Sequence, residues 1–298
     1  MNRTWAAIVN PASGSRRPAD PELSRLVRRL EEVACPVVTT EYQGHAQHLT
    51  AGFERADGVI VAGGDGTLFD VLQTLRRDRQ QVVLVPTGRG NSLARDLGLP
   101  LRESAILASM PGRPVAIDLL AVSLEFEDGR RWQGVAASTV ALGYPARVCR
   151  LAEDCRRWTG RHGYTLTAPA VRPSAMAWRA SFDGEPAASS AGTGVIISNT
   201  RHLGPFEGFP EARLADGLCE VMALRAGWWA QNLHNVSVLT RWHGFRPVRV
   251  WRARTVVVDV ALPLLVMIDG ELRPGVRRVA VTVLPAALTC RVPGGSHE

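Results

Sequence analysis

The feature that most constrains the fold is a regular alternation of apolar, strand-like runs with helix-like or glycine-bounded segments over the first 120 residues. Such alternation is typical of a doubly wound parallel sheet, so this part of the chain is predicted to be an α/β domain. The predicted strands are 5–9, 37–40, 58–62 and 82–85, and the predicted helices are 21–33, 45–55, 68–76 and 92–97.

From residue 117 the pattern changes to short apolar runs that are punctuated by Asp-Gly pairs. Asp-Gly between apolar runs is a strong signal for a hairpin turn, so this region is predicted to be an antiparallel β-rich, sandwich-like domain. Two stretches inside it, 146–157 and 229–239, are compatible with helices.

The amino-acid composition limits the kinds of partner that the chain is expected to bind. The chain has 35 Lys and Arg against 28 Asp and Glu, a net charge of +7, which favours an anionic partner: nucleotide phosphates, nucleic acid or an anionic membrane surface. No apolar run reaches the roughly 18 residues of a membrane span, so we expect a cytoplasmic protein that contacts membranes only at its surface. The five cysteines are scattered and lack zinc-site spacing, which predicts reduced thiols.

Three of the predicted strands open into loops that lack bulky side chains where the backbone turns. These loops cover residues 10–17, 63–67 and 86–92. Glycines there let backbone N–H groups approach an anion, and the helices that follow add their positive ends. Ordinary helix capping by Thr67, Asn91 or Ser92 would explain any one loop. Three such loops together favour a phosphate site, although neither standard phosphate-binding fingerprint is present.

Charged residues accompany these loops. Asp65 lies between two glycines, Arg16 and Arg17 lie at the end of the first loop, and Arg89 lies in the third. Charge-assisted hydrogen bonds from such arginines would strengthen the binding of a phosphate.

The motifs in these loops resemble those of the diacylglycerol kinase catalytic domain family, which includes bacterial lipid kinases and sphingosine and ceramide kinases. The matching segments are Asn-Pro-x-Ser-Gly at 10–14, Gly-Gly-Asp-Gly-Thr at 63–67, the glycine-rich stretch 86–98, Asp-Gly-Leu at 216–218 and Asp-Gly-Glu at 269–271. Further similarity at 138–147 and 198–204 extends the match over nearly the whole chain.

The resemblance implies a two-domain kinase with its active site in a cleft. Residues 1–118, completed by about 285–298, would bind ATP, and residues 119–284 would bind the lipid. It also implies ATP and Mg²⁺ as cofactors and a membrane lipid with a free hydroxyl, such as diacylglycerol, as the acceptor. Nucleic acid is not expected as a partner, and an anionic membrane surface is.

Site residues carry over from the resemblance position by position. The implied catalytic residues are Glu271, Asp269 and Asp65, with Glu271 favoured as the base. The implied ATP-binding residues are Asn10, Pro11, Ala12, Ser13, Gly14, Thr40, Gly63, Gly64, Asp65, Gly66, Thr67, Arg89 and Asn91. The implied metal ligands of a structural magnesium site are the Asp216 side chain and the carbonyls of Arg213 and Leu218.

Two departures from the family pattern leave alternatives open. Arg89 replaces a small hydroxyl residue and would either grip or occlude a phosphate, and Phe69-Asp70 replaces Asn-Glu. A kinase similar to NAD kinase and a non-catalytic nucleotide- or lipid-binding protein therefore remain as alternatives.

Two other features have an ordinary structural interpretation as well as a functional one. The early Asp-Gly-Glu at 183–185 is expected to be a plain turn. Trp228, Trp229 and the arginines nearby would form either buried aromatics with a basic rim or a membrane patch. The sequence names neither the lipid nor the oligomeric state.

Overall fold

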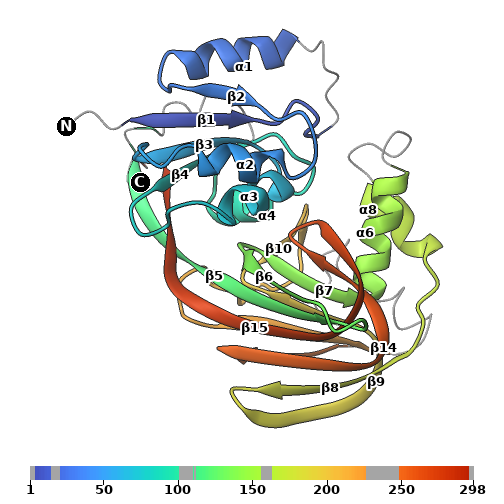
Figure 1. Ribbon diagram of the computed structural model, residues 1–298. Coiled ribbons are helices and arrows are strands. Elements are labelled where there is room, and N and C mark those ends of the chain that lie inside the picture. Colours follow the sequence, from blue (N-terminus) through green and yellow to red (C-terminus); the bar gives the residue numbers. More distant parts are fainter. Residues whose placement is uncertain are drawn as a thin grey trace. The chain divides into compact units, whose positions relative to one another are not determined.

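The computed structural model describes residues 4–14, 21–100, 110, 112–155, 163–225 and 248–294 (Figure 1). The chain divides into two compact units. One comprises Met1–Asp118 with Pro285–Glu298, and the other comprises Leu119–Leu284.

The first unit is built on a parallel sheet with the strand order β15–β4–β3–β1–β2. Its strands are β1 (Trp5–Val9), β2 (Val37–Thr39), β3 (Gly58–Gly63), β4 (Gln81–Pro86) and the end of β15 (Glu271–Val292). The last strand joins through the pairs Thr289 with Gln81 and Arg291 with Val83. The end of the chain therefore completes the sheet that its beginning forms.

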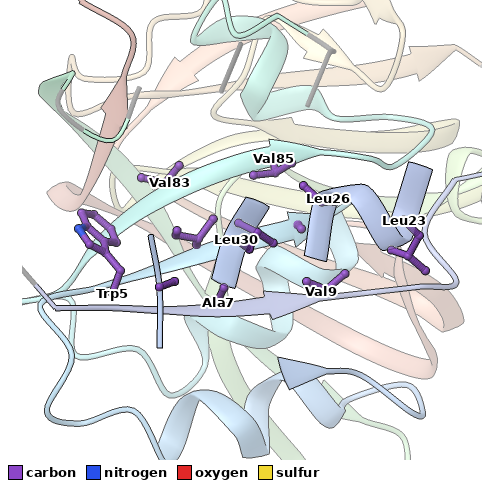
Figure 2. Packing of buried hydrophobic residues seen from close by; sticks show 11 residues of the cluster. Trp5, Ala7, Val9, Leu23, Leu26, Leu30, Val83 and Val85 are labelled. Atoms are coloured by element: carbon purple, nitrogen blue, oxygen red, sulfur yellow. The ribbon is translucent and has the colours of Figure 1, made fainter. Parts of the chain in front are cut away.

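Helices cover this sheet because its strands are apolar on both faces. Leu23, Leu26 and Leu30 of α1 pack over Trp5, Ala7 and Val9 of β1 and over Val83 and Val85 of β4 (Figure 2). Successive side chains of a strand point to opposite faces, so Ala6 and Ile8, both fully buried, serve the other face. The helices are α1 (Pro21–Glu31), α2 (His45–Ala51), α3 (Asp65–Leu72) and α4 (Ser92–Asp96).

Helix boundaries differ from the sequence-based prediction in one way that matters for the site. The expected helix 68–76 begins at Asp65 and ends at Leu72, because Gly64 adopts an extended conformation and acts as the N-cap. Asp65 and Thr67 therefore lie in the first turn of α3 rather than in a loop. The helix expected at 45–55 ends at Ala51, before Gly52.

The second unit is antiparallel and β-rich, as the Asp-Gly pattern predicts. Turns at Asp128, Asp183 and Asp269 join the hairpins β5–β6, β8–β9 and β14–β15. Its strands are β5 (Arg113–Phe126), β6 (Arg131–Ala136), β7 (Thr139–Gly143), β8 (Met176–Phe182), β9 (Glu185–Ser198), β10 (His202–Leu203), β11 (Phe206–Glu207), β12 (Cys219–Arg225), β13 (Val248–Ala253), β14 (Thr255–Ile268) and β15. The predicted fold class, a doubly wound parallel sheet with a β-rich second part, is confirmed.

An apolar cluster lies where α6 (Tyr144–Asp154) packs on β7, β9 and β12. Tyr144 and Val148 of the helix meet Ile196 and Met222 of the sheet. The other helical elements of this unit are α8 (Gly163–Thr167) and the short helix η2 (Ala168–Ala170).

Some expectations fall on residues outside the described ranges. The helix at 229–239, Trp228, Trp229, Arg16 and Arg17 are among them. Within the described ranges, no helix is long and apolar enough to cross a membrane. All five cysteines are free thiols, and burial raises the pKa of Cys219 and of Cys290 to about 12.

Candidate functional site

The three glycine-containing segments meet at one edge of the parallel sheet. They follow β1, β3 and β4, which are neighbours in register, with Val9 beside Ala62 and Gly63 beside Pro86. Backbone hydrogen bonds continue the pairing beyond the strands, from Asn10 N–H to the Ala62 carbonyl (2.8 Å) and from Thr87 N–H to the Gly63 carbonyl (3.0 Å). Ligands of open parallel sheets bind at this carboxyl edge.

Glycine is required where these segments touch. A Cβ atom added to Gly88 would lie 2.4 Å from the Cα of Gly64, so the second and third segments approach backbone to backbone. Gly14 has a φ of +74°, and a Cβ there would lie 2.4 Å from the carbonyl oxygen of Thr87. Larger residues would push the three segments apart.

Side chains fix the first segment to the second. Asn10 donates through Nδ2 to Thr67 Oγ1 at 2.9 Å and accepts the Ala12 N–H through Oδ1 at 2.9 Å. Ser13 and Thr67 are buried beside them. Thr40 follows β2 at the same sheet edge and donates its N–H to the Val9 carbonyl at 2.9 Å. The sequence-predicted residues of the first two segments are thus brought together.

Asp65 is partly buried at the start of α3, and its Oδ1 accepts the Ser92 N–H at 2.8 Å. Burial raises the pKa of Asp65 to about 6, since desolvation outweighs the hydrogen bonds from Ser92 and Asn91 and the nearby Arg95 charge. An acid with a pKa displaced toward neutrality among backbone N–H groups is a candidate functional group.

The third segment is held by its own side chains. Asn91, with a φ of +53°, accepts the Gly88 N–H at 3.0 Å and donates to the Gly88 carbonyl at 2.7 Å. Arg89 is partly buried, and its Nη1 is shielded from solvent. The neighbouring Thr87 Oγ1 is buried without a hydrogen-bond partner within the described part of the chain. A buried hydroxyl of this kind suits a ligand that brings an acceptor atom.

The departure at Phe69-Asp70 has a structural explanation. Phe69 is 3% exposed and belongs to the core of the first unit. Asp70 accepts the Gly44 N–H through Oδ2 at 3.1 Å, which ties α3 to the turn before α2. Sequence reasoning missed this contact, because nothing near Gly44 signals it.

In the second unit, Asp269 is a buried carboxylate saturated by backbone donors. It is 4% exposed and accepts the N–H groups of Ala137 (2.6 Å), Ser138 (3.0 Å) and Thr139 (2.7 Å). With both oxygens engaged, Asp269 anchors the start of β7 to the β14–β15 turn. The catalytic role that the resemblance implies for Asp269 stays a prediction.

Glu271 lies two residues further, at the start of β15. Its side chain is 15% exposed, and its Oε2 is 4.0 Å from Arg273 Nη1. On the neighbouring helix α6, Cys149 Sγ approaches the Gly270 carbonyl at 3.9 Å. The turn that carries Glu271 is therefore packed beside the apolar cluster of α6.

The early Asp-Gly-Glu has the same local conformation in a different environment. Asp183 and Asp269 have φ values of +52° and +47°. Asp183 is exposed and caps the N–H groups of Arg254 and Thr255, at 2.9 and 2.8 Å. The two triplets therefore share a backbone conformation, and what distinguishes them is that Asp269 is buried and Asp183 is exposed.

A buried polar network surrounds the Asp269 anchor, and the similarity at 138–147 and 198–204 is its only trace in the sequence analysis. Thr139 Oγ1 lies 3.3 Å from Ser198 Oγ, which donates to the Thr200 carbonyl at 2.9 Å. Asn199 donates to the Ala137 carbonyl at 3.2 Å. These buried hydrogen bonds rigidify the segments 137–139 and 198–200, which lie next to the 269–271 turn.

Asp216, whose side chain is expected to bind a structural magnesium ion, has another partner. Asp216 accepts the Leu218 N–H through Oδ1 at 3.1 Å, and its Oδ2 forms an ion pair with Arg252. Arg213 is exposed. Among the described residues, no group of three or more His, Cys, Asp or Glu side chains is placed to hold a metal ion.

Comparisons with known proteins agree with this arrangement. The diacylglycerol kinase catalytic domain model matches residues 4–122, and the YegS C-terminal NAD kinase beta sandwich-like domain matches residues 138–292. A probable lipid kinase YegS-like protein of Pseudomonas aeruginosa is 30% identical, covering 83% of this chain and 80% of that protein. A diacylglycerol kinase of Bacillus subtilis is 24% identical, covering 89% of this chain and 88% of that protein.

The fold is also that of a solved structure. A crystal structure of a diacylglycerol kinase from Bacillus anthracis superposes with a TM-score of 0.75 at 20% identity, covering 98% of each chain.

Proposed function

The chain belongs to the diacylglycerol kinase catalytic domain family and is a lipid kinase, and we propose that it transfers the γ-phosphoryl group of ATP to the hydroxyl of a diacylglycerol-like lipid. The observation that carries the proposal is the convergence of three glycine-containing segments on Asp65 at one sheet edge. Phosphoryl transfer depends mostly on positioning and charge neutralisation, which is what such an edge supplies.

In this proposal the first unit binds ATP. The segments 10–14 and 63–67 border the phosphates, and the start of α3 adds its positive end. The closely packed glycines leave no side chain between backbone and ligand. Thr87 Oγ1 donates to an acceptor atom of the ligand, and Arg89 provides a cationic contact.

Asp65 is the residue that fits Mg²⁺ in this unit. Mg²⁺ binds proteins through one or two carboxylates together with substrate phosphates, and Asp65 is a carboxylate held by the Ser92 N–H at the edge where the three segments meet. The ion neutralises phosphate charge when bound. Asp65 therefore has to be ionised to hold it, which its pKa of about 6 allows at neutral pH.

In the second unit, Glu271 accepts the proton of the lipid hydroxyl. Its side chain is 15% exposed, whereas the buried carboxylate of Asp269 accepts three backbone N–H groups. Asp269 holds the turn against β7, so that the backbone carrying Glu271 is rigid. A carboxylate base contributes about 10²- to 10⁴-fold to such a reaction.

A lipid acceptor is favoured over a dinucleotide by the surroundings of Glu271. The apolar side chains of α6, with Tyr144 and Val148 in its cluster, pack next to the 269–271 turn. The net charge of +7 suits an anionic membrane surface, where such a lipid resides. The B. subtilis relative named diacylglycerol kinase supports the same acceptor class.

The test is incubation with γ-³²P-labelled ATP and Mg²⁺ in the presence of mixed micelles of diacylglycerol, monoacylglycerol, sphingosine or ceramide, or of NAD in solution. Thin-layer separation of the products should show label in phosphatidic acid. Label in NADP instead would overturn the proposal in favour of a NAD kinase, and no transfer to any acceptor would favour a binding protein.

A further inference from the structure

A single guanidinium joins two acidic groups in the second unit. Arg252 of β13 lies directly opposite Glu220 of β12 in the antiparallel register, and its Nε donates to Glu220 Oε1 at 2.8 Å. Its Nη2 pairs with Oδ2 of Asp216, in the turn that leads into β12. Arg252 therefore connects the strand pair to the preceding turn through two carboxylates.

The site concentrates negative charge. The side chain of Glu220 is 5% exposed, and that of Asp216 is 21% exposed, so both acids of this site are largely removed from water. Two carboxylates therefore share one arginine. Without a cation among them, their mutual repulsion would oppose folding of this turn.

The same turn contains the residues that the family pattern assigns to a structural magnesium ion. Those donors do not fit Mg²⁺ in this chain. One oxygen of Asp216 accepts the Leu218 N–H, and the other is covered by the guanidinium of Arg252. A divalent cation there would lie beside a fixed positive charge and be repelled by it, more strongly in a partly buried site than in bulk water.

We propose that the Arg252 guanidinium replaces a structural metal ion at this turn, so that the second unit folds around a cation supplied by its own chain. The register places Arg252 opposite Glu220, so the pairing of β13 with β12 brings the positive charge of Arg252 next to Glu220. The planar guanidinium has enough N–H donors to bind both carboxylates at once.

The experiment compares thermal unfolding of nucleotide-free protein in EDTA and in millimolar MgCl₂. The wild-type Tm should be the same in both. Arg252→Gln should unfold several degrees lower in EDTA, because Asp216 and Glu220 lose their cation, and Mg²⁺ should restore part of the loss. Arg252→Lys, which keeps the charge, should remain insensitive to metal and covers the case in which Arg252→Gln does not fold.

Arg278→Gln is the matched control. Arg278 forms a 2.6 Å ion pair with Asp259 on the same unit, and its side chain is 43% exposed against 44% for Arg252. It pairs with a single acid, so its loss should shift Tm little and create no response to Mg²⁺.

Two outcomes would overturn the proposal. One is a wild-type protein that loses stability in EDTA and binds one Mg²⁺ by calorimetry, with Asp216→Asn abolishing the binding. The other is an Arg252→Gln variant that is as stable as Arg278→Gln in EDTA.

Discussion

Oδ1 of Asp65 accepts a hydrogen bond from the backbone N–H of Ser92 at 2.8 Å. The bond joins the first turn of α3 to the first turn of α4, two helices that follow neighbouring strands of the parallel sheet. It holds the acid of the second glycine segment against the third segment. One contact therefore sets the position of the carboxylate that we propose as the magnesium ligand.

Replacing Asp65 with asparagine should lower kcat by about 10²-fold or more, because an amide has no charge with which to hold Mg²⁺. The amide oxygen can still accept the Ser92 N–H, so Tm should not fall. Steady-state kinetics and a melting curve on the same preparation check both statements. Asp70→Asn, on the same helix, should keep most of the activity; full activity in Asp65→Asn would refute the role of Asp65.

The pKa of Asp65 also predicts how stability depends on pH. Burial raises that pKa from 3.8 to about 6, so the folded protein binds more protons than the unfolded chain between these values. The contribution of Asp65 to stability is thus fully present below about pH 4 and is lost as pH rises through 6. The Tm of Asp65→Asn minus that of wild type should increase over this interval and level off above it. A difference that stays constant from pH 4 to 7 contradicts the shifted pKa.

Arg89→Ala should weaken ATP binding about tenfold or more, since a charge-assisted contact contributes about 1.5 to 3 kcal/mol. Calorimetric titration with a non-hydrolysable ATP analogue measures this directly. Arg76→Ala is the control in the same unit, because Arg76 is exposed and its ion pair is with the exposed Glu54, at 3.8 Å. Unchanged or tighter binding in Arg89→Ala would mean that this arginine occludes the phosphate site.

Glu271→Gln should lower kcat by about 10²-fold or more with little change in Tm or in ATP affinity, because it removes the proton acceptor and keeps the side-chain shape. The matched control is Glu185→Gln in the early triplet, whose side chain is exposed. Equal losses in both variants, or a loss only at Glu185, would show that the acceptor site has been assigned to the wrong hairpin.

Asp269→Asn should lower Tm and kcat together. The amide loses charge-assisted hydrogen bonds from three backbone N–H groups, each worth about 1.5 to 3 kcal/mol before relaxation, so several degrees of Tm are expected. Asp183→Asn, at the same turn position but exposed, should retain activity. A variant at Asp269 with normal Tm and no activity would instead indicate direct participation in the chemistry.

Local pattern was enough to predict the elements and the loops. Strands such as β1 and β3 are uninterrupted apolar runs, and each is followed by residues that only a turn accommodates, so their order and the shared sheet edge follow from short-range chemistry. The Asp-Gly hairpins are predicted for the same reason. The fold class and the three segments of the proposed phosphate site could therefore be predicted from the sequence alone.

The burial and the contacts of each carboxylate depend on the tertiary structure. Asp183 and Asp269 share an Asp-Gly-Glu triplet and nearly the same φ, yet one is exposed and the other is buried against residues more than 120 positions earlier in the chain. Asp216 matches a metal-ligand pattern, but its partner is Arg252, 36 residues away. A local pattern carries no information about such distant partners, because strand pairing and packing bring them together only in the folded chain.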